Sequence, residues 1–536
     1  MKGKMQNFPI NLVYILEHAA KFHSEQLIVS LMKDGSRHRY SYQEALKRSK
    51  KLANALQSNG INSGDRVATL AWNDFRHFEA WYGIIGQGAI CHTVNPRLFA
   101  DQISFIINDA QDKIVLVDPD FVPLLEGIQE QLTTVERYVV LCSSDDMPAT
   151  NLNNAICYEN YIDEQSDEFE WALIAEGDAT SLCYTSGTTG NPKGVLYSHR
   201  SNFLMAQAVC GADAFALGSC SNVLAVVPMF HANSWGLVYS VPMVGGKLVL
   251  PGSQLDGDSI HKVILDEQIN FSAAVPTVWT LLLEHLRSNK LQLPTLKEVV
   301  VGGAAVSSAM VYSFKNDFDI QVLHAWGMTE ISPLGSLSRP TSSTLKLPQE
   351  EQFVLALKQG RPLFGVDMCL KDEQNQLLPH DGKSPGRLFV KGPWIIERYY
   401  GAKHSALLDG WFDTGDIATI DEYGFMQITD RAKDIIKSGG EWISSVDLEN
   451  AAMSHPNILL AAVIGIPDPK WDERPMMLVK LNDMDSNLTA EALRKHLTGY
   501  VASWWIPERI EFIDDIPLTA TGKINKGPLR EKFLEA

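Results

Sequence analysis

The segment from Tyr184 to Gly194 has the residue types needed to bind a polyphosphate. It contains four serine and threonine hydroxyls, three glycines and one lysine. Glycine lets backbone N–H groups approach an anion and point toward it, the hydroxyls add donors, and Lys193 adds positive charge. A short polar run is otherwise an ordinary flexible loop, so the rest of the chain must support this prediction. The predicted phosphate-binding residues are Thr185, Ser186, Gly187, Thr188, Thr189 and Lys193.

The segment does not follow the Walker pattern, which requires G-x-x-x-x-G-K followed by serine or threonine. Counted from Gly187, the second glycine position holds Pro192. Gly194 follows Lys193, where the pattern needs a hydroxyl that holds magnesium. The loop is therefore not the phosphate-binding loop of a P-loop nucleoside triphosphatase.

Three later segments combine turn residues with charged side chains. Each has an ordinary explanation when taken alone, because a lone glutamate or lysine is commonly solvated and Asp-x-Gly-Asp commonly forms a turn. It is the presence of all three segments, in this order, that indicates a shared function. The segments are Ala325–Glu330, Trp411–Asp416 and Pro517–Lys526.

Together with the first loop, these segments resemble the motifs of the adenylate-forming superfamily, which includes acyl-CoA synthetases, peptide-synthetase adenylation domains and beetle luciferases. The resemblance covers nearly the whole chain. It implies a reaction with ATP, Mg²⁺ and coenzyme A in two halves. A carboxylate first attacks the α-phosphate of ATP, giving an acyl-AMP and pyrophosphate, and a thiol then displaces AMP. Positioning and charge stabilisation carry such chemistry.

The resemblance assigns nucleotide-binding roles to the segment Ala325–Glu330. Glu330, with Thr185, is expected to hold magnesium, because hard cations prefer oxygen ligands, and Thr329 is expected to contact phosphate. The family usually has a tyrosine where this chain has Trp326, so an aromatic face remains for adenine while the phenol hydroxyl is lost. The neighbouring residues expected in the same site are Gly327 and Met328.

The resemblance also assigns roles to the last two segments. Asp416 is expected to accept hydrogen bonds from both ribose hydroxyls, and Arg431 to contact ribose or phosphate. Lys523 is expected to enter the active site and stabilise the negative charge that develops during adenylation. We expect Lys526, three residues later, to be a surface charge.

The two half-reactions need different groups, and the family meets this need by rotating a small C-terminal domain. Lys433 lies where relatives place the hinge, while Gly439 and Gly440 resemble the loop that lines the pantetheine tunnel. We therefore predict a large domain at residues 1–430, which binds ATP and the acyl group. Residues 431–536 are predicted to form a small mobile domain.

Strand and helix patterns alternate along the large predicted domain. Short β-branched runs and helical spacing of apolar residues predict a strand at 66–70, a helix at 75–86 and a strand at 298–301. A capping box at Ser41–Glu44 predicts the start of another helix. This rhythm predicts layered α/β architecture with mostly parallel sheets, followed by a small α+β domain. Further strands are expected at 89–94, 113–117, 137–141, 222–228, 246–250, 321–323, 459–464 and 476–481, and helices at 445–453 and 490–497.

Two segments, Pro228–Trp235 and Val299–Ala304, are expected to bind the acyl group. His231 lies near the place where relatives bind the carboxylate, and Trp235 is either a wall of the acyl pocket or a swinging gate, as in some fatty-acyl relatives. A packed histidine and a core tryptophan are the ordinary alternatives. Glycine would let a ligand approach the backbone closely. The remaining residues expected to contact nucleotide or substrate are Gly302, Gly303, Ala304, Met328 and Pro333.

The identity of the acid is predicted from the side chains near the acyl site and from the family resemblance. No acidic residue stands at His231 to bind an amino group, so an amino-acid substrate is not expected. The segment Asp430–Glu449 most resembles bacterial medium- and long-chain fatty-acid–CoA ligases and 3-methylmercaptopropionate–CoA ligases. Bulky residues at Trp235, Trp326 and Met328 favour a short or medium uncharged acid, including 3-methylmercaptopropionate. A long-chain fatty-acid–CoA ligase, a luciferase-like oxidising enzyme and a non-catalytic binding protein on the same fold stay open as alternatives.

Composition and terminal sequences indicate the partners, the redox state and the location of the protein. The formal net charge of -18 argues against nucleic-acid binding, which requires a basic face. The seven scattered cysteines contain no C-x-x-C and indicate reduced thiols, not a disulfide framework or a zinc site. No signal peptide, membrane span or peroxisomal Ser-Lys-Leu address is recognised. We therefore expect a cytoplasmic enzyme whose partners are small molecules. A homodimer is a separate expectation.

Overall fold

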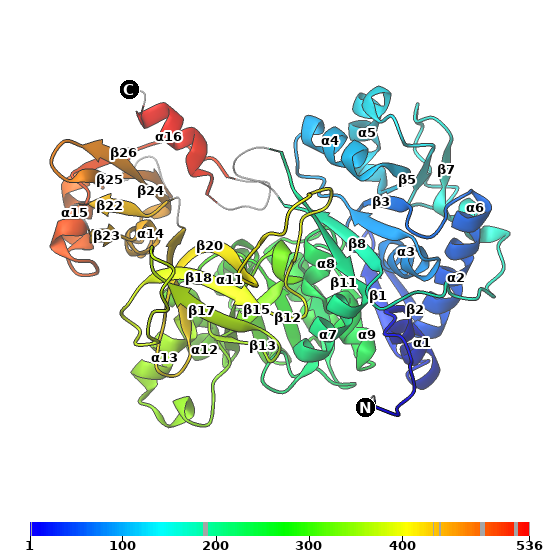
Figure 1. The fold of residues 1–536 in the computed structure, drawn as a ribbon, viewed down its shortest axis with the longest axis horizontal. Helices are drawn as coiled ribbons and strands as arrows, with labels where there is room; N and C mark the ends of the chain where they lie inside the picture. Colours follow the sequence, from blue (N-terminus) through cyan, green and yellow to red (C-terminus); the bar gives the residue numbers. More distant parts are fainter. Residues whose placement is uncertain are drawn as a thin grey trace.

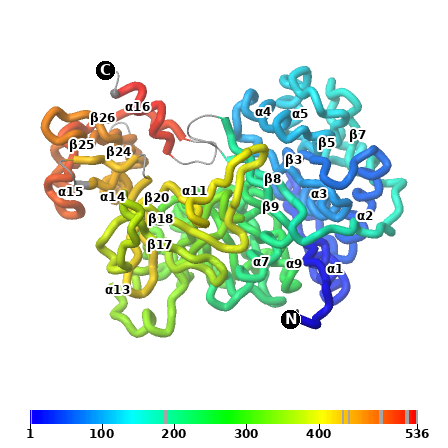
Figure 2. The backbone as a smooth tube through the Cα atoms, in the orientation of Figure 1, coloured from blue at the N-terminus to red at the C-terminus, as the bar shows by residue number. Residues whose placement is uncertain are grey.

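The structure is a computed structural model that describes residue 1 and residues 3–185, 191–431, 434–438, 441–482, 488–518 and 524–534. A large body contains most of the chain, and a smaller C-terminal unit, orange to red in Figure 1, lies at one end of it. The tube in Figure 2 shows that the chain reaches this smaller unit only after it has traversed the large body.

Two large sheets form the centre of the body. One has seven strands in the order β7 (Ala155–Cys157), β6 (Arg137–Val140), β5 (Asp112–Val117), β3 (Arg66–Leu70), β4 (Ile90–Thr93), β8 (Ala179–Tyr184), β9 (Gly194–Ser198). The other has nine strands in the order β16 (Arg361–Pro362), β15 (Leu334–Leu337), β14 (Gln321–Gly327), β13 (Glu298–Val301), β12 (Phe271–Ala274), β10 (Asn222–Ala225), β11 (Lys247–Leu250), β1 (Leu27–Leu31), β2 (Arg37–Ser41).

Parallel pairing dominates both sheets, as the alternation of strands and helices predicts. In the seven-stranded sheet β3 is parallel to β4 and β5, and in the nine-stranded sheet β13 is parallel to β12 and β14. Antiparallel pairs occur toward the edges, at β8 with β9, β1 with β2, and β14 with β15. The predicted phosphate loop is the connection between β8 and β9.

Helices cover the sheets. In the body they are α1 (Val13–Phe22), α2 (Tyr42–Ser58), α3 (Phe75–Gly86), α4 (Ala100–Ala110), α5 (Val122–Ile128), α6 (Tyr158–Asp163), α7 (His199–Cys210), α8 (Ala232–Trp235), α9 (Leu237–Met243), α10 (Gly257–Asp266), α11 (Pro276–Asn289), α12 (Ser308–Phe318) and α13 (Gln349–Leu357). Short 3₁₀ turns occur at Pro119–Phe121, Gln129–Gln131, Thr329–Ile331 and Thr344–Lys346, with one more at Ser503–Trp505 in the C-terminal unit.

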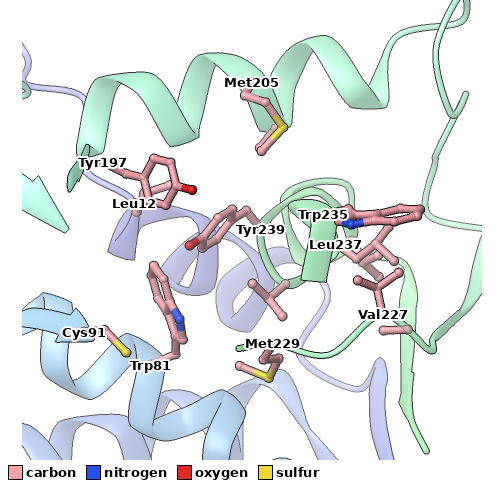
Figure 3. Packing of buried hydrophobic residues seen from close by; sticks show 14 of the residues in the cluster. Leu12, Trp81, Cys91, Tyr197, Met205, Val227, Met229, Trp235, Leu237 and Tyr239 are labelled. Carbon is pink, nitrogen blue, oxygen red and sulfur yellow. The ribbon is translucent and has the colours of Figure 1, made fainter. Parts of the chain in front are cut away.

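The main hydrophobic core lies between the two large sheets. Trp81 of α3, Met205 of α7, Tyr239 of α9 and Cys91 of β4 are buried there (Figure 3). Leu248 of β11 belongs to the same cluster, so both sheets contribute to it. Burial of such large apolar side chains is the main force that holds the layers together. Separate clusters on the outer faces join α10–α12 to one sheet and α4 and α5 to the other. The layers therefore alternate between helix and sheet.

Two smaller sheets complete the fold. The first, at the end of the body, consists of β17 (Asp367–Lys371), β18 (Gly386–Lys391), β19 (Leu407–Leu408), β20 (Trp411–Ile420) and β21 (Met426–Arg431). The second belongs to the C-terminal unit and consists of β22 (Ile436–Ser438), β23 (Glu441–Ile443), β24 (Ile458–Asp468), β25 (Asp472–Leu481) and β26 (Arg509–Phe512). The helices of this unit are α14 (Ser445–Met453), α15 (Ala490–Leu497) and α16 (Lys526–Leu534). The predicted fold class is confirmed.

Local sequence signals account for several element boundaries. Ser41 Oγ accepts a hydrogen bond from the Glu44 N–H at 3.2 Å, and the Glu44 carboxylate accepts one from the Ser41 N–H at 2.7 Å, so the predicted capping box begins α2. The bounds of β3, α3, β13, α14 and α15 are those predicted. The strand predicted at 222–228 is shorter, because β10 ends at Ala225.

The cysteines and the helix lengths can be compared with the expectations drawn from the sequence. All seven cysteines are free thiols, as predicted. None of the helices in the described ranges combines the length and the apolar character of a membrane span.

Candidate functional site

A cavity of about 410 Å³ lies where the large body meets the C-terminal unit. Its walls come from segments at the carboxyl ends of β4, β8, β10, β13 and β14, from Arg431 at the end of β21, and from the start of α16. The carboxyl ends of parallel strands are where α/β proteins usually bind ligands. The predicted site residues that line the cavity are Thr185, His231, Trp235, Gly302, Gly303, Trp326, Gly327, Met328, Thr329, Glu330, Pro333 and Arg431.

Some predicted site residues lie elsewhere. Ala304 and Lys193 are both exposed, and neither lines the cavity. Asp416 is buried behind the lining, at 1% exposure. Several predicted residues fall outside the described residues, namely Ser186, Gly187, Thr188, Thr189, Lys433, Gly439, Gly440 and Lys523.

The described ends of the phosphate loop are held together. The Thr185 N–H donates to the Lys193 carbonyl at 2.9 Å, and the Lys193 N–H donates to Thr185 Oγ1 at 3.4 Å. These bonds extend the β8–β9 pairing by one residue on each strand. The loop therefore leaves and rejoins the sheet at one point on the cavity rim.

Glu330 is oriented by a tyrosine that the sequence analysis missed. The Tyr399 hydroxyl donates to Glu330 Oε1 at 2.8 Å, and the Lys193 ammonium lies 5.0 Å from the centre of the Tyr399 ring. Burial raises the pKa of Tyr399, and Glu330 raises it further, so the phenol keeps its proton and remains a donor. Tyr197 fixes the adjacent residue, because its hydroxyl donates to the Thr329 carbonyl at 2.7 Å. No sequence motif pointed to either tyrosine.

Trp326 and Arg431 both bind the carboxylate of Asp416. The Trp326 indole N–H donates to Asp416 Oδ2 at 3.0 Å, and Arg431 Nε lies 2.9 Å from Asp416 Oδ1. Trp326 therefore supplies a hydrogen bond through its ring nitrogen at the position where tyrosine is usual. This contact joins β14 to β20 and places Asp416 directly behind the aromatic wall of the cavity.

The backbone that presents Trp235 is left-handed. Ala232, Asn233, Ser234 and Trp235 have φ values of 44°, 57°, 54° and 50°, a conformation that costs about 1–2 kcal/mol for each residue other than glycine. Buried hydrogen bonds hold it: Ser234 Oγ donates to the Val227 carbonyl at 2.6 Å, and Asn233 Nδ2 donates to Ser181 Oγ at 3.3 Å. Strained backbone held in this way is typical of functional sites.

The indole of Trp235 lies against the backbone of Gly302. A Cβ atom added at Gly302 would be 2.8 Å from Trp235 Cη2, closer than real side chains approach. Trp235 is 7% exposed and belongs to the main core, yet it lines the cavity. The indole is therefore part of the cavity lining in this structure.

Asn73 fixes the segment that leads to His231 and was also missed. Its buried amide donates to the carbonyls of Ala225 and Val227 at 2.9 and 2.7 Å, and its Oδ1 accepts from the Met229 N–H at 2.6 Å. These bonds take the place of a sheet partner where β10 ends. An asparagine that follows a strand has no distinctive pattern in a single sequence.

The prediction that Lys526 is a surface charge is wrong. Lys526 is 8% exposed, and its Nζ lies 2.7 Å from Glu449 Oε1 and 2.6 Å from Ser445 Oγ. Its partners are contributed by α14, some eighty residues earlier in the chain, so the sequence around Lys526 gave no sign of them. Lys526 also lines the cavity.

Comparison with known proteins identifies relatives that match nearly the whole chain. The profile of the AMP-binding enzyme family matches residues 16–400, and that of the AMP-binding enzyme C-terminal domain matches residues 447–523. The chain is 44% identical over 534 residues to a medium-chain-fatty-acid–CoA ligase of Ectopseudomonas oleovorans, covering 99% of this chain and 98% of the relative. It is 43% identical over 537 residues to a 3-methylmercaptopropionyl-CoA ligase of Ruegeria lacuscaerulensis, covering 100% and 99%.

A solved structure shows the same architecture. The crystal structure of an anthranilate CoA ligase in complex with anthranoyl-AMP superposes with a TM-score of 0.87 at 25% identity and covers 99% of both chains. The fold, the cavity and the two profiles define a nucleotide-dependent ligase, and this chain belongs to the AMP-binding enzyme family. Within that family it is an acyl-CoA ligase.

Proposed function

We propose that this enzyme joins a short- or medium-chain, uncharged carboxylic acid to coenzyme A, with ATP converted to AMP and pyrophosphate. The observation that carries the proposal is the composition of the cavity. Polar residues Thr185, Glu330 and Arg431 line one part, and an apolar wall that contains Trp235 lines another. Such a cavity suits a substrate with a charged nucleotide end and an apolar acyl end.

Apart from His231, which is expected to lie near the reacting carboxylate, the described lining around Trp235 offers no ionisable side chain for a second charge. Among the described lining residues, those from 228–235, 302–303 and 325–328 include no Asp, Glu, Lys or Arg. An amino acid or a dicarboxylic acid would leave a buried charge without a partner there, which is costly. This supports an uncharged acyl group such as a short fatty acid or 3-methylmercaptopropionate, the acids named for the relatives.

The nucleotide roles follow from the same geometry. Glu330 offers a carboxylate to magnesium, which would draw together the phosphates of ATP and neutralise charge during transfer. Within the described residues no three His, Cys, Asp or Glu side chains form a metal-binding cluster, and Mg²⁺ at phosphate-transfer sites is typically held by few protein ligands, with substrate phosphates and water supplying the rest. Asp416 would receive the ribose hydroxyls next to the contacts from Trp326 and Arg431, and Thr185 and Thr329 would contact phosphate.

Several features of the enzyme are proposals of the same kind. The division into domains at 430/431, rotation about Lys433 and pantetheine binding at Gly439 and Gly440 follow from the family resemblance. A cytoplasmic location and a homodimer are proposed as well. Light scattering would measure the oligomeric state, and fractionation of the source cells would give the location.

The first prediction concerns the products. With ATP, Mg²⁺, coenzyme A and a panel of carboxylic acids, we expect stoichiometric AMP and pyrophosphate, because the β8–β9 loop lacks the Walker ending. Separation of the nucleotides by ion-pair chromatography, with an enzymatic pyrophosphate assay, measures both. ADP as the stoichiometric nucleotide product would refute the proposal, and absence of turnover with every acid would favour the non-catalytic alternative.

The second prediction concerns Trp235→Ala. Removing the indole uncovers Gly302, so the best substrate should shift toward longer acids, measured as kcat/KM from acetate to palmitate for parent and variant. Apolar pockets discriminate by about 1–3 kcal/mol for each methylene, so each profile should be broad. An exposed tryptophan of the C-terminal unit, Trp504, gives the control variant Trp504→Ala, which should leave the profile unchanged.

The outcomes of this series separate the alternatives. If rates change but the profile does not, Trp235 is a gate. If the parent enzyme prefers palmitate, the enzyme is a long-chain fatty-acid–CoA ligase and the short-to-medium proposal is wrong.

A further inference from the structure

The buried ammonium of Lys526 is the centre of a charged network beside the active-site cavity. Its Nζ contacts Glu449 Oε1 at 2.7 Å and Ser445 Oγ at 2.6 Å. Ser445 in turn binds Asp430, donating from its N–H to Oδ2 at 2.6 Å and from its hydroxyl to Oδ1 at 3.0 Å. The network therefore joins three elements: β21 at the junction of the two units, α14 and the start of α16.

All four members of the network are buried. Asp430 and Ser445 are 0% exposed, Glu449 is 7% exposed and Lys526 is 8% exposed. Burial raises the pKa of Glu449 and of Asp430, and the ammonium of Lys526 opposes both rises. Buried ions are kept only where partners compensate the lost hydration. Lys526 is the cation that compensates both carboxylates.

A second cation binds the junction one helical turn further along α16. Arg530 Nη2 lies 2.7 Å from Asp434 Oδ1, three residues past the end of β21. Residues four apart lie on the same face of a helix. This face of α16 is therefore linked to residues 430–434 at two points: Lys526 reaches Asp430 through Ser445, and Arg530 binds Asp434.

The described residues on the two sides of 519–523 pair with each other. Leu518 and Ile524 form an antiparallel bridge, and the Asn525 N–H donates to the Pro517 carbonyl at 2.8 Å. Ile524, Asn525 and Lys526 all line the cavity. The described end of the final motif, residues 524–526, therefore lies against the cavity. The Lys526 side chain anchors it there.

We propose that Lys526 is a positioning residue for the adenylation half-reaction: through Ser445 and Glu449 it fixes the end of the final motif against the junction and the cavity. This inference rests on the proposed function, in which Lys523 acts during adenylation. Three residues of chain span at most about 11 Å, so the placement of Lys526 limits where the Lys523 ammonium can reach. Arg530 supports the same placement.

The physical effect is one of geometry. A shift of a catalytic group by about 1 Å can lower a rate by roughly 10²-fold. Without the Lys526 ammonium, Glu449 loses its ion-pair partner, and the start of α16 is no longer tied to α14. The thiol-transfer half-reaction uses other groups and does not depend on this anchor.

The test compares the two half-reactions in the full-length enzyme. Lys526→Met removes the charge while keeping much of the side-chain length, and Arg530→Met removes the second, less buried anchor. The matched control is Lys480→Met, because Lys480 makes an exposed ion pair with Asp515 in the same unit, at 2.8 Å, and exposed pairs contribute little. Acyl-AMP formation is measured as single-turnover pyrophosphate release, and thioester formation is measured from supplied acyl-AMP. Melting temperatures are recorded for every variant.

Lys526→Met should slow acyl-AMP formation roughly 10- to 100-fold and affect thioester formation much less. Arg530→Met should show a smaller loss in the same half-reaction, and it carries the test if Lys526→Met does not fold. Equal losses in both half-reactions, in step with a lower melting temperature, would show a merely structural role and overturn the inference, as would unchanged adenylation. A parent enzyme that releases no pyrophosphate with any acid would instead refute the proposed function.

Discussion

Replacement of Lys523 by alanine should slow acyl-AMP formation roughly 10²–10³-fold, the usual loss when one donor to a developing oxyanion is removed. The residue directly precedes Ile524, which lines the cavity, and the family resemblance assigns it to the first half-reaction. Its ammonium would stabilise the charge that builds on the carboxylate oxygen and the α-phosphate. Single-turnover pyrophosphate release measures this step.

Thioester formation from supplied acyl-AMP should change little in the same variant. The thiol attacks only after acyl-AMP has formed, when the negative charge that develops during adenylation is no longer present. Lys532→Ala is a suitable control, since Lys532 is an exposed lysine on α16 and should leave both steps unchanged. Equal losses in both half-reactions of Lys523→Ala would show that the division of labour is wrong.

The second large effect is expected for Glu330→Gln. Charge stabilisation by a bound metal is worth several kcal/mol, so adenylation should fall at least about 100-fold. The concentration of Mg²⁺ needed for half-maximal rate should rise, because an amide is a poorer ligand than a carboxylate. Titration with MgCl₂ at saturating ATP measures both effects.

Tyr399→Phe provides the comparison for this variant. It removes the 2.8 Å hydrogen bond to Glu330 Oε1 but keeps the carboxylate, so the rate should fall less and the Mg²⁺ requirement should stay near that of the parent. If Glu330→Gln has the Mg²⁺ dependence of the parent enzyme, Glu330 is not the metal ligand.

Local patterns predicted the elements whose neighbours are close in sequence. The capping box at Ser41 depends on residues three positions apart, and it is present at the start of α2. The strand predicted at Gln321–Leu323 is longer in the structure because β14 changes partner: it pairs with β13 up to His324 and then with β15 from Ala325. A partner supplied by a later segment leaves no mark on the strand itself.

In the site, too, contacts made by segments distant in sequence could not be predicted. The motifs contain many of the residues that surround the cavity, and Glu330 and Trp326 both line it. The contacts that orient these residues come from distant segments. Tyr399 reaches Glu330 from 69 residues away, and Trp326 binds Asp416 across 90 residues. Lys526 is buried for the same reason: its described partners, Ser445 and Glu449, come from α14.

The contact between Trp235 and Gly302 has a consequence for how the acyl pocket can evolve. A side chain at position 302 would collide with the indole, and a smaller residue at position 235 would leave a void over the glycine. The two positions should therefore change together among relatives, with bulk traded between the turn after β10 and the strand end of β13. Chain-length preference can then drift through paired substitutions, while the nucleotide-binding residues stay as they are.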